Sequence, residues 1–171
     1  VANNTGSATR NITVNAVNDA PVLANIESTA LSYFENDPST AITSTLTVND
    51  VDSATLASAT VQITTNCTSG EDVLSFTTQN GISGVYSAAT CTIALTGSSS
   101  VANYQTALRA VSYSNSSENP STAPRTVTFQ VNDGAASNNL SNTQARNITV
   151  IAVNDAPVLA GIEAGTLSYT E

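Results

Sequence analysis

The nine residues AVNDAPVLA stand at 16–24 and return, unchanged, at 152–160. The likeness extends on both sides, because NITVNAVNDAPVLANIESTALSYFE at 11–35 aligns with NITVIAVNDAPVLAGIEAGTLSYTE at 147–171. The offset is constant at 136 residues, from Asn11 to Asn147. A period of this length matches a whole domain rather than a small solenoid unit. The sequence therefore predicts tandem domains joined at AVNDAP.

This period divides the chain into three parts. We expect residues 1–17 to be the last strand of a preceding repeat, 18–154 to be one complete repeat with its linkers, and 155–171 to be the first strand of a following repeat. Neighbouring repeats would belong to one long chain, or identical chains would complete one another head to tail. The second arrangement is the open geometry that produces filaments.

Within the repeat, apolar and polar residues alternate in several short segments. The apolar positions are Ile12, Val14 and Ala16; Leu46 and Val48; Val61 and Ile63; Ile93 and Leu95; and Val127, Phe129 and Val131. This period of two, with turn formers such as Asn80-Gly81 between the segments, indicates the half-buried strands of an antiparallel β-sandwich.

One segment has a different period. Val101, Tyr104, Leu108 and Val111 follow the spacing of an amphipathic helix. We therefore expect an all-β fold with one short helix near 100–109, crossing one end of the sandwich.

The composition limits the chemistry open to the chain. It has no Lys, His, Met or Trp, and 13 acidic residues against four arginines give a net charge of −9. Most general bases and nitrogen metal ligands are therefore missing, and we expect no enzymatic activity. The negative field repels nucleic acid and anionic lipid but attracts cations, and no segment is apolar over the length that spans a bilayer. We expect no nucleic-acid partner and no membrane insertion.

The two cysteines, Cys67 and Cys91, leave two interpretations. They could form one disulfide, which would suit a secreted protein. A pair of buried free thiols would look the same in the sequence.

Acidic residues fall at or beside the ends of the predicted strands. The tripeptide Val-Asn-Asp occurs four times, at 17–19, 48–50, 131–133 and 153–155, and holds four of the seven aspartates. Strand ends of a sandwich gather at two poles, so acids that are distant in sequence can meet there. Carboxylates that meet repel one another unless a cation lies between them. Ca²⁺ suits such a site, because it accepts six to eight oxygen ligands in loose geometry.

Other interpretations of these acids stay open. Asp at a strand end commonly forms an Asx-turn or a surface charge. Asp37 could be a turn residue, and Glu71 and Asp72 could be ligands, part of a turn, or a solvated charge pair.

Several motifs, in this order, are typical of one family. They are AVNDAPVL at 16–23, SYFEN at 32–36, VNDVDS at 48–53, GEDVLSF at 70–76, NYQTALRAVSYSNSSENPST at 103–122 and TVTFQVNDG at 126–134. With these motifs the chain resembles the cadherin-like tandem repeats of large bacterial surface and secreted proteins. The resemblance implies a Greek-key β-sandwich of the cadherin or immunoglobulin type.

The resemblance also implies a set of calcium ligands divided between neighbouring domains. Asn18 and Asp19 would share Ca²⁺ with Asp50, Asp52 and Asp133. Asn154 and Asp155 would share other Ca²⁺ ions with Glu35 and Glu118. The late loop of animal cadherins carries a fuller acidic motif than the single Glu118 of this chain.

These ligands suggest a mechanical role. We expect a calcium-binding structural repeat of an extracellular filament or a cell-surface adhesin stalk, in which Ca²⁺ stiffens the linkers between neighbouring copies of the repeat. The alternatives are an adhesion module that binds glycan or cells, and a spacer in a secreted polysaccharide-degrading enzyme.

Overall fold

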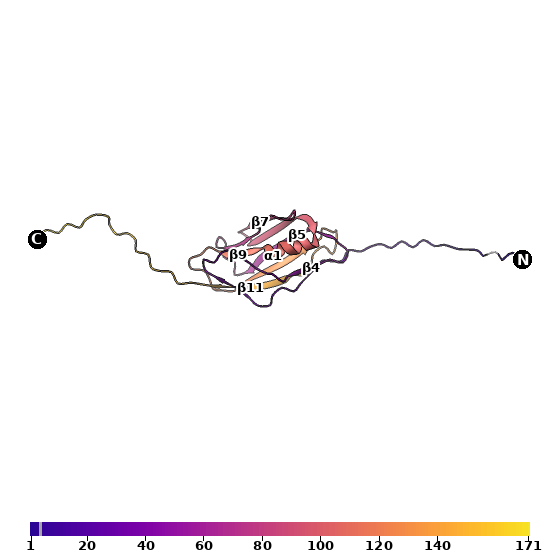
Figure 1. Ribbon diagram of the computed structural model, residues 1–171, viewed down its shortest axis with the longest axis horizontal. Helices are drawn as coiled ribbons and strands as arrows, with labels where there is room; N and C mark the ends of the chain where they lie inside the picture. The colour runs from indigo at the N-terminus through magenta and orange to yellow at the C-terminus, as the bar shows by residue number, and fades with distance from the viewer. Residues whose placement is uncertain (4) are drawn as a thin grey trace.

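A computed structural model describes residues 1–3 and 5–171. Strands and helix lie between Val22 and Ile151, and the segments before and after this folded region leave it in opposite directions (Figure 1). The fold is mainly β, with several sheets and one short helix. Within the described residues, no helix has the length and apolar character that crossing a membrane requires.

The largest sheet has six strands. Their order across the sheet is β2 (Leu31–Phe34), β11 (Gln144–Ile151), β10 (Arg125–Asn132), β5 (Thr55–Thr65), β8 (Thr92–Ser100) and β7 (Ser83–Ser87). Neighbours run antiparallel, except that β11 is parallel to β2, with Ile148 opposite Leu31 and Ile151 opposite Phe34. The last strand of the folded region therefore lies between β10, which precedes it directly in sequence, and β2, which is distant from it in sequence.

The remaining strands form two smaller sheets. The first has three antiparallel strands, in the order β3 (Thr40–Ala41), β9 (Ser112–Asn115) and β6 (Asp72–Ser75). The second pairs β1 (Val22–Ala24) with β4 (Thr47–Asn49), again antiparallel. Through β1, the end of the first AVNDAPVLA phrase is part of the fold.

A single apolar core joins all the sheets and the helix. It contains Val61, Ile93 and Phe129 from the six-stranded sheet, and Leu74 and Tyr113 from the three-stranded sheet. Side chains alternate along the strands, as in β10, where every second residue is buried. The positions predicted to face the core from Leu46 to Val131 are all buried. Burying one such side chain completely contributes about 1.5–3 kcal/mol.

The predicted helix is confirmed as α1 (Val101–Ala110). Ser100 is its N-cap, and the Ser100 side chain accepts a hydrogen bond from the Asn103 amide nitrogen at 3.2 Å. Tyr104, Ala107 and Leu108 are buried in the core. The Arg109 Nε atom in the last turn donates to the Leu46 carbonyl at 2.8 Å, which ties the helix to the segment that leads into β4.

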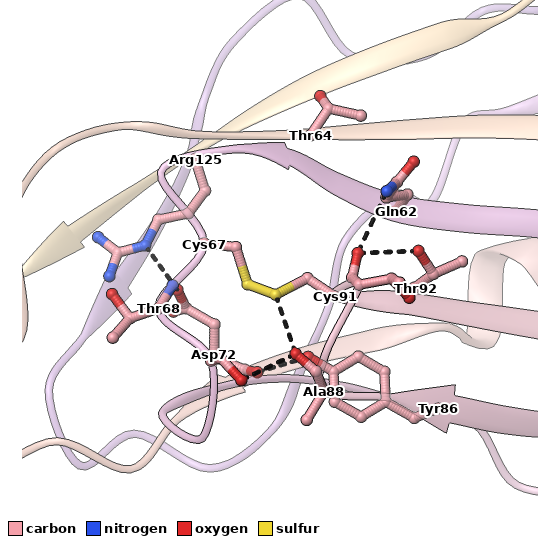
Figure 2. Close-up of a disulfide and its surroundings, with 12 residues drawn as sticks. Gln62, Thr64, Cys67, Thr68, Asp72, Tyr86, Ala88, Cys91, Thr92 and Arg125 are labelled. Carbon is pink, nitrogen blue, oxygen red and sulfur yellow. Dashed lines mark hydrogen bonds and ion pairs between the residues drawn. A yellow bond between two sulfur atoms is a disulfide. The ribbon is translucent and has the colours of Figure 1, made fainter.

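The two cysteines form a disulfide, which confirms the first of the two interpretations above. Cys67 lies between β5 and β6 and Cys91 between β7 and β8, with 6.5 Å between their Cα atoms (Figure 2). The bond closes a loop of 24 residues in sequence separation. Restricting the unfolded chain in this way contributes about 3 kcal/mol to stability.

The prediction of a half-buried strand at Ile12, Val14 and Ala16 is wrong for this chain. These side chains are exposed, and the described residues before Val22 form no strand. A strand needs a neighbour to bind its backbone groups, and this chain supplies none for that segment. Residues 155–171 likewise form no strand. The assignment of both ends to neighbouring repeats stays a prediction.

Candidate metal centre

Three carboxylates meet at the end of the folded region where β11 finishes. Oxygen atoms of Glu35, Glu118 and Asp155 lie within 4.8 Å of one another. Glu35 follows β2, Glu118 lies in the loop at 116–124 between β9 and β10, and Asp155 follows β11. We call these three residues the acidic triad. It could bind a metal ion, and it brings together three of the four residues that the sequence assigned to this seam.

Glu35 is held in place by the parallel pairing of β2 and β11. Its amide nitrogen donates to the Ile151 carbonyl at 2.9 Å, and its Oε2 atom accepts from the Val153 amide nitrogen at 2.7 Å. The side chain is only 5% exposed, and Oε1 has no hydrogen-bond partner among the described residues. An unpartnered buried oxygen of a charged group is costly, so a bound cation would be favourable here.

The other two members of the triad are exposed. The Asn36 Nδ2 atom donates to Glu118 Oε2 at 3.4 Å, and the Asn154 Nδ2 atom donates to the Asp155 backbone carbonyl at 3.0 Å. Each pair of carboxylates at such distances repels by about 1 kcal/mol in water, and more beside a buried group. The fold therefore keeps the three carboxylates together despite their mutual repulsion.

Asp37, just beyond Glu35, is a turn residue. Its amide nitrogen donates to the Phe34 carbonyl at 3.0 Å, and its Oδ2 atom accepts from the Phe34 amide nitrogen at 3.3 Å. The Tyr33 hydroxyl also donates to the Asp37 carbonyl. These contacts hold the turn that carries Glu35 out of β2.

The other end of the folded region carries a second group of predicted ligands: Asn18, Asp19, Asp50, Asp52 and Asp133. The Asn18 Nδ2 atom donates to Asp133 Oδ2 at 2.8 Å, and the Asp19 amide nitrogen donates to Asp52 Oδ2 at 3.1 Å. The Asp52 amide nitrogen donates to Asp50 Oδ1 at 3.2 Å. These contacts join Asn18 to Asp133, and Asp19 to Asp52 and Asp50; we call the five residues the N-terminal acidic group. Among the described residues, the three carboxylates that come within 4.8 Å of one another are those of the acidic triad, and the N-terminal acidic group is not brought together to that extent.

Turn contacts use part of the binding capacity of this group. Asp50 Oδ1 also accepts from the Ser53 amide nitrogen at 2.9 Å, and Asp133 Oδ1 accepts from the Ala135 amide nitrogen at 2.7 Å. These are the Asx-turns that the sequence left open. Asp50 Oδ2, in contrast, is buried and has no partner among the described residues. The turn at Asp50 therefore occupies only one of its two carboxylate oxygens.

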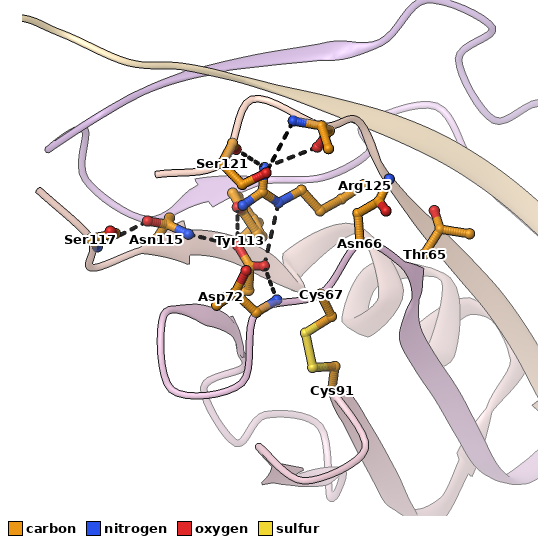
Figure 3. Close-up of polar contacts among 12 residues, drawn as sticks. Thr65, Asn66, Cys67, Asp72, Cys91, Tyr113, Asn115, Ser117, Ser121 and Arg125 are labelled. Carbon is orange, nitrogen blue, oxygen red and sulfur yellow. Dashed lines mark hydrogen bonds and ion pairs between the residues drawn. A yellow bond between two sulfur atoms is a disulfide. The ribbon is translucent and has the colours of Figure 1, made fainter. Parts of the chain in front are cut away.

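Asp72 is neither a solvated charge nor part of the acidic triad. Its side chain is fully buried, and Oδ2 forms an ion pair of 3.3 Å with Nε of Arg125, which is also fully buried (Figure 3). The Tyr113 hydroxyl donates to Asp72 Oδ1 at 2.5 Å. Burial, together with this bond to a carboxylate, raises the pKa of the Tyr113 hydroxyl far above its usual range. No local pattern in the sequence signals a buried pair whose members are 53 residues apart.

No protein-family model matches the chain, and no curated protein is similar to it in sequence. The resemblance to cadherin-like repeats therefore stays a prediction. The described residues enclose no pocket.

Proposed function

We propose that this chain contains a calcium-binding structural repeat of an extracellular filament or a cell-surface adhesin stalk. The observation that carries the proposal is the acidic triad, in which Glu35 is buried and keeps one oxygen without a partner. The triad lies where the repeated linker phrase leaves the fold, so an ion bound there would restrict the linker. Asp155, which the linker itself supplies, would be drawn towards the body of the repeat.

The donor atoms favour Ca²⁺ over other metal ions. The triad offers carboxylate oxygens, and the chain has no His while both of its cysteines are in a disulfide. Zn²⁺ and copper usually require nitrogen or sulfur ligands, and Mg²⁺ demands near-ideal octahedral geometry and keeps several waters. Ca²⁺ accepts carboxylates, amide carbonyls and water in flexible geometry.

The arrangement of the chain supports a head-to-tail array. The two ends of the folded region point in opposite directions (Figure 1), so copies joined at AVNDAP would follow one another in a line. At each seam, the equivalents of the acidic triad from one repeat would meet the equivalents of the N-terminal acidic group from the next. The number of oxygen ligands would then approach the six to eight that Ca²⁺ accepts.

A cadherin-like β-sandwich suits this role. The six-stranded and three-stranded sheets contribute to one core, which supports a sandwich architecture. The disulfide is typical of proteins in oxidising compartments and supports an extracellular location. Extracellular calcium modules commonly bind with a Kd of about 10⁻⁴–10⁻³ M, so the repeat would be stiffened only after export.

Calcium titration with a matched pair of variants tests the proposal. Glu35→Gln removes the buried ligand, whereas Glu171→Gln changes the equivalent residue of the second copy, which is exposed. For a Kd of about 10⁻⁴ M, 10 mM Ca²⁺ should add about 2.7 kcal/mol to the free energy of unfolding of the wild-type chain. The gain should be reduced in Glu35→Gln and kept in Glu171→Gln.

Calorimetry and denaturant unfolding would measure these differences, with Mg²⁺ as the competing ion. A wild-type chain whose stability does not respond to Ca²⁺ would rule the proposal out. Small-angle scattering of a chain of several repeats, with and without EGTA, would test the mechanical role, because removing the ion should shorten the particle.

A further inference from the structure

The loop at 116–124, which carries Glu118, is held at both ends by one buried carboxylate. The loop begins after Asn115, the last residue of β9, and ends before Arg125, the first residue of β10. Both of these residues are bound to Asp72, the first residue of β6 (Figure 3).

At the first end, Asp72 reaches the loop through Asn115. The Asn115 Nδ2 atom donates to Asp72 Oδ1 at 2.7 Å, and Asn115 itself is buried. The Asn115 Oδ1 atom then accepts from the Ser117 amide nitrogen at 2.9 Å. Ser117 Oγ in turn accepts from the Asn119 amide nitrogen at 3.2 Å. The residues on both sides of Glu118 are thereby connected to Asp72.

At the second end, Asp72 reaches the loop through Arg125. The Arg125 Nε atom contacts Asp72 Oδ2 at 3.3 Å, and its Nη1 atom donates to the carbonyls of Ser121 and Ala123, the latter at 3.0 Å. The guanidinium group therefore holds the returning part of the loop by its backbone. Because this group is buried, it depends on Asp72 for its counter-charge.

Asp72 is itself fixed by the turn that follows the disulfide. The Thr68 amide nitrogen donates to Asp72 Oδ2 at 2.7 Å, and the Asp72 amide nitrogen donates to the Thr68 carbonyl at 3.0 Å. Thr68 follows Cys67, which is bonded to Cys91 (Figure 2). Each oxygen of Asp72 has two donors, namely Tyr113 and Asn115 on Oδ1, and Thr68 and Arg125 on Oδ2. The carboxylate of Asp72 is therefore occupied and does not act as a metal ligand.

We infer that Asp72 is a positioning residue for the metal centre. It holds both ends of the loop so that Glu118 stays beside Glu35 and Asp155. This inference rests on the proposed calcium-binding function and adds to it a residue that touches no ion. Groups that orient metal ligands typically change metal affinity by about 10–100-fold when they are lost.

The test compares calcium affinity in variants that do and do not disturb this connection. Asp72→Asn weakens both ends of the loop but leaves the Arg125 charge without its partner. Asn115→Ala removes only the link between Asp72 and Ser117, and it keeps the Asp72–Arg125 pair, so it avoids a buried unpaired charge. Glu71→Gln is the matched control. Glu71 is not a member of the acidic triad, and it contacts the loop through its backbone carbonyl, which accepts from the Ser116 amide nitrogen at 3.0 Å.

We expect Asn115→Ala to lower the calcium affinity of the acidic triad about tenfold or more, and Glu71→Gln to leave it unchanged. The loss should disappear in a Glu118→Gln background, because Asn115 then has no ligand to position. A general loss of structure would instead weaken binding in both backgrounds. Circular dichroism should show that Asn115→Ala is folded.

Two results would overturn the inference, and they are distinguishable. If the wild-type chain binds Ca²⁺ and folded Asn115→Ala binds it equally well, the positioning role is wrong while the proposed function stands. If the wild-type chain binds no Ca²⁺, the proposed function fails, and the positioning role fails with it.

Discussion

The two copies of the repeated segment, 11–35 and 147–171, have nearly the same sequence and opposite patterns of burial. In the first copy, Leu23 is 1% exposed within β1, whereas Ile12 and Val14 are 83% and 86% exposed. In the second copy the burial is reversed. Ile148 and Val150, the equivalents of Ile12 and Val14, are at most 1% exposed within β11, whereas Leu159, the equivalent of Leu23, is 87% exposed.

The difference arises from the partners that each segment finds. β11 lies between β10 and β2, and β1 pairs with β4, so each buried half has strands from the rest of the repeat beside it. The exposed halves have the same propensities but no such neighbours. The change from one state to the other falls at Val-Asn-Asp in both copies. In this chain, the second half of the first copy therefore begins the folded region, and the first half of the second copy ends it.

The largest effect in this comparison should come from deleting the segment that contains β11. Deleting 144–171 removes β11, and with it the fully buried Ile148, so the loss should exceed the total stability of about 5–15 kcal/mol that is usual for a domain. Deleting 1–14 removes a segment whose described residues are all exposed, and it should change the free energy of unfolding by less than about 0.5 kcal/mol. Urea unfolding followed by circular dichroism would measure both. Equal effects of the two deletions on the free energy of unfolding would contradict the assignment of one buried half and one exposed half to each copy.

A smaller effect is expected from single substitutions at equivalent positions. Leu23→Ala removes a buried side chain and should cost about 2–5 kcal/mol, whereas Leu159→Ala should change stability by less than about 0.5 kcal/mol. Both variants make the same chemical change in the same local sequence, so each is the control for the other. A large loss in Leu159→Ala would contradict the exposed state of the second copy.

The smallest expected effect on stability concerns Glu27, a glutamate that occurs at the equivalent position of both copies. Glu27 accepts hydrogen bonds from Thr43 Oγ1 at 2.6 Å and from the Ser44 amide nitrogen at 2.8 Å, and it lies 3.5 Å from Arg146. Partial burial acts to raise the pKa of the Glu27 carboxyl, but the hydrogen bonds from Thr43 and Ser44 outweigh it and lower this pKa from 4.5 to about 2. The equivalent residue of the second copy, Glu163, is exposed.

Because the pKa of Glu27 is lower in the folded state, its stabilising effect should be complete above pH 4.5 and should be lost as the pH falls towards 2. Partial exposure and solvent screening limit this effect to about 1 kcal/mol. Glu27→Gln should remove the pH-dependent contribution, and Glu163→Gln should keep it. Unfolding measured between pH 2 and pH 7 would separate the two. A Glu27→Gln variant with the pH dependence of the wild-type chain would contradict this account.

Local patterns predicted much of the fold. The alternation at Val127, Phe129 and Val131 is a property of neighbouring residues, and the strand β10 follows it. Asn80-Gly81 forms a turn with φ values of 53° and 76°, a conformation that these two residues adopt readily. The amphipathic spacing of α1 was visible for the same reason. Such features need no knowledge of what lies across the core.

The same local patterns failed where distant partners decide the outcome. Ile12 and Val14 alternate as well as Ile148 and Val150 do, but no strand lies beside them in this chain. Asp50 and Asp52 form one acidic pair in the sequence, and Glu71 and Asp72 form another. Local sequence does not show which of these acids is buried. Asp52 lies at the N-terminal acidic group, whereas Asp72 is buried against Arg125.

From the sequence alone came the period of 136 residues, the positions of the strands β4, β5, β8 and β10, the helix, and the set of acids from which a metal centre could be built. The tertiary structure decided which half of each repeated phrase is buried, and that Glu35, Glu118 and Asp155 meet while Asp72 organises the loop from inside. The physical reason is that periodicity and turn preference act between residues a few positions apart. Burial and the meeting of charges depend on segments that only the folded chain brings together.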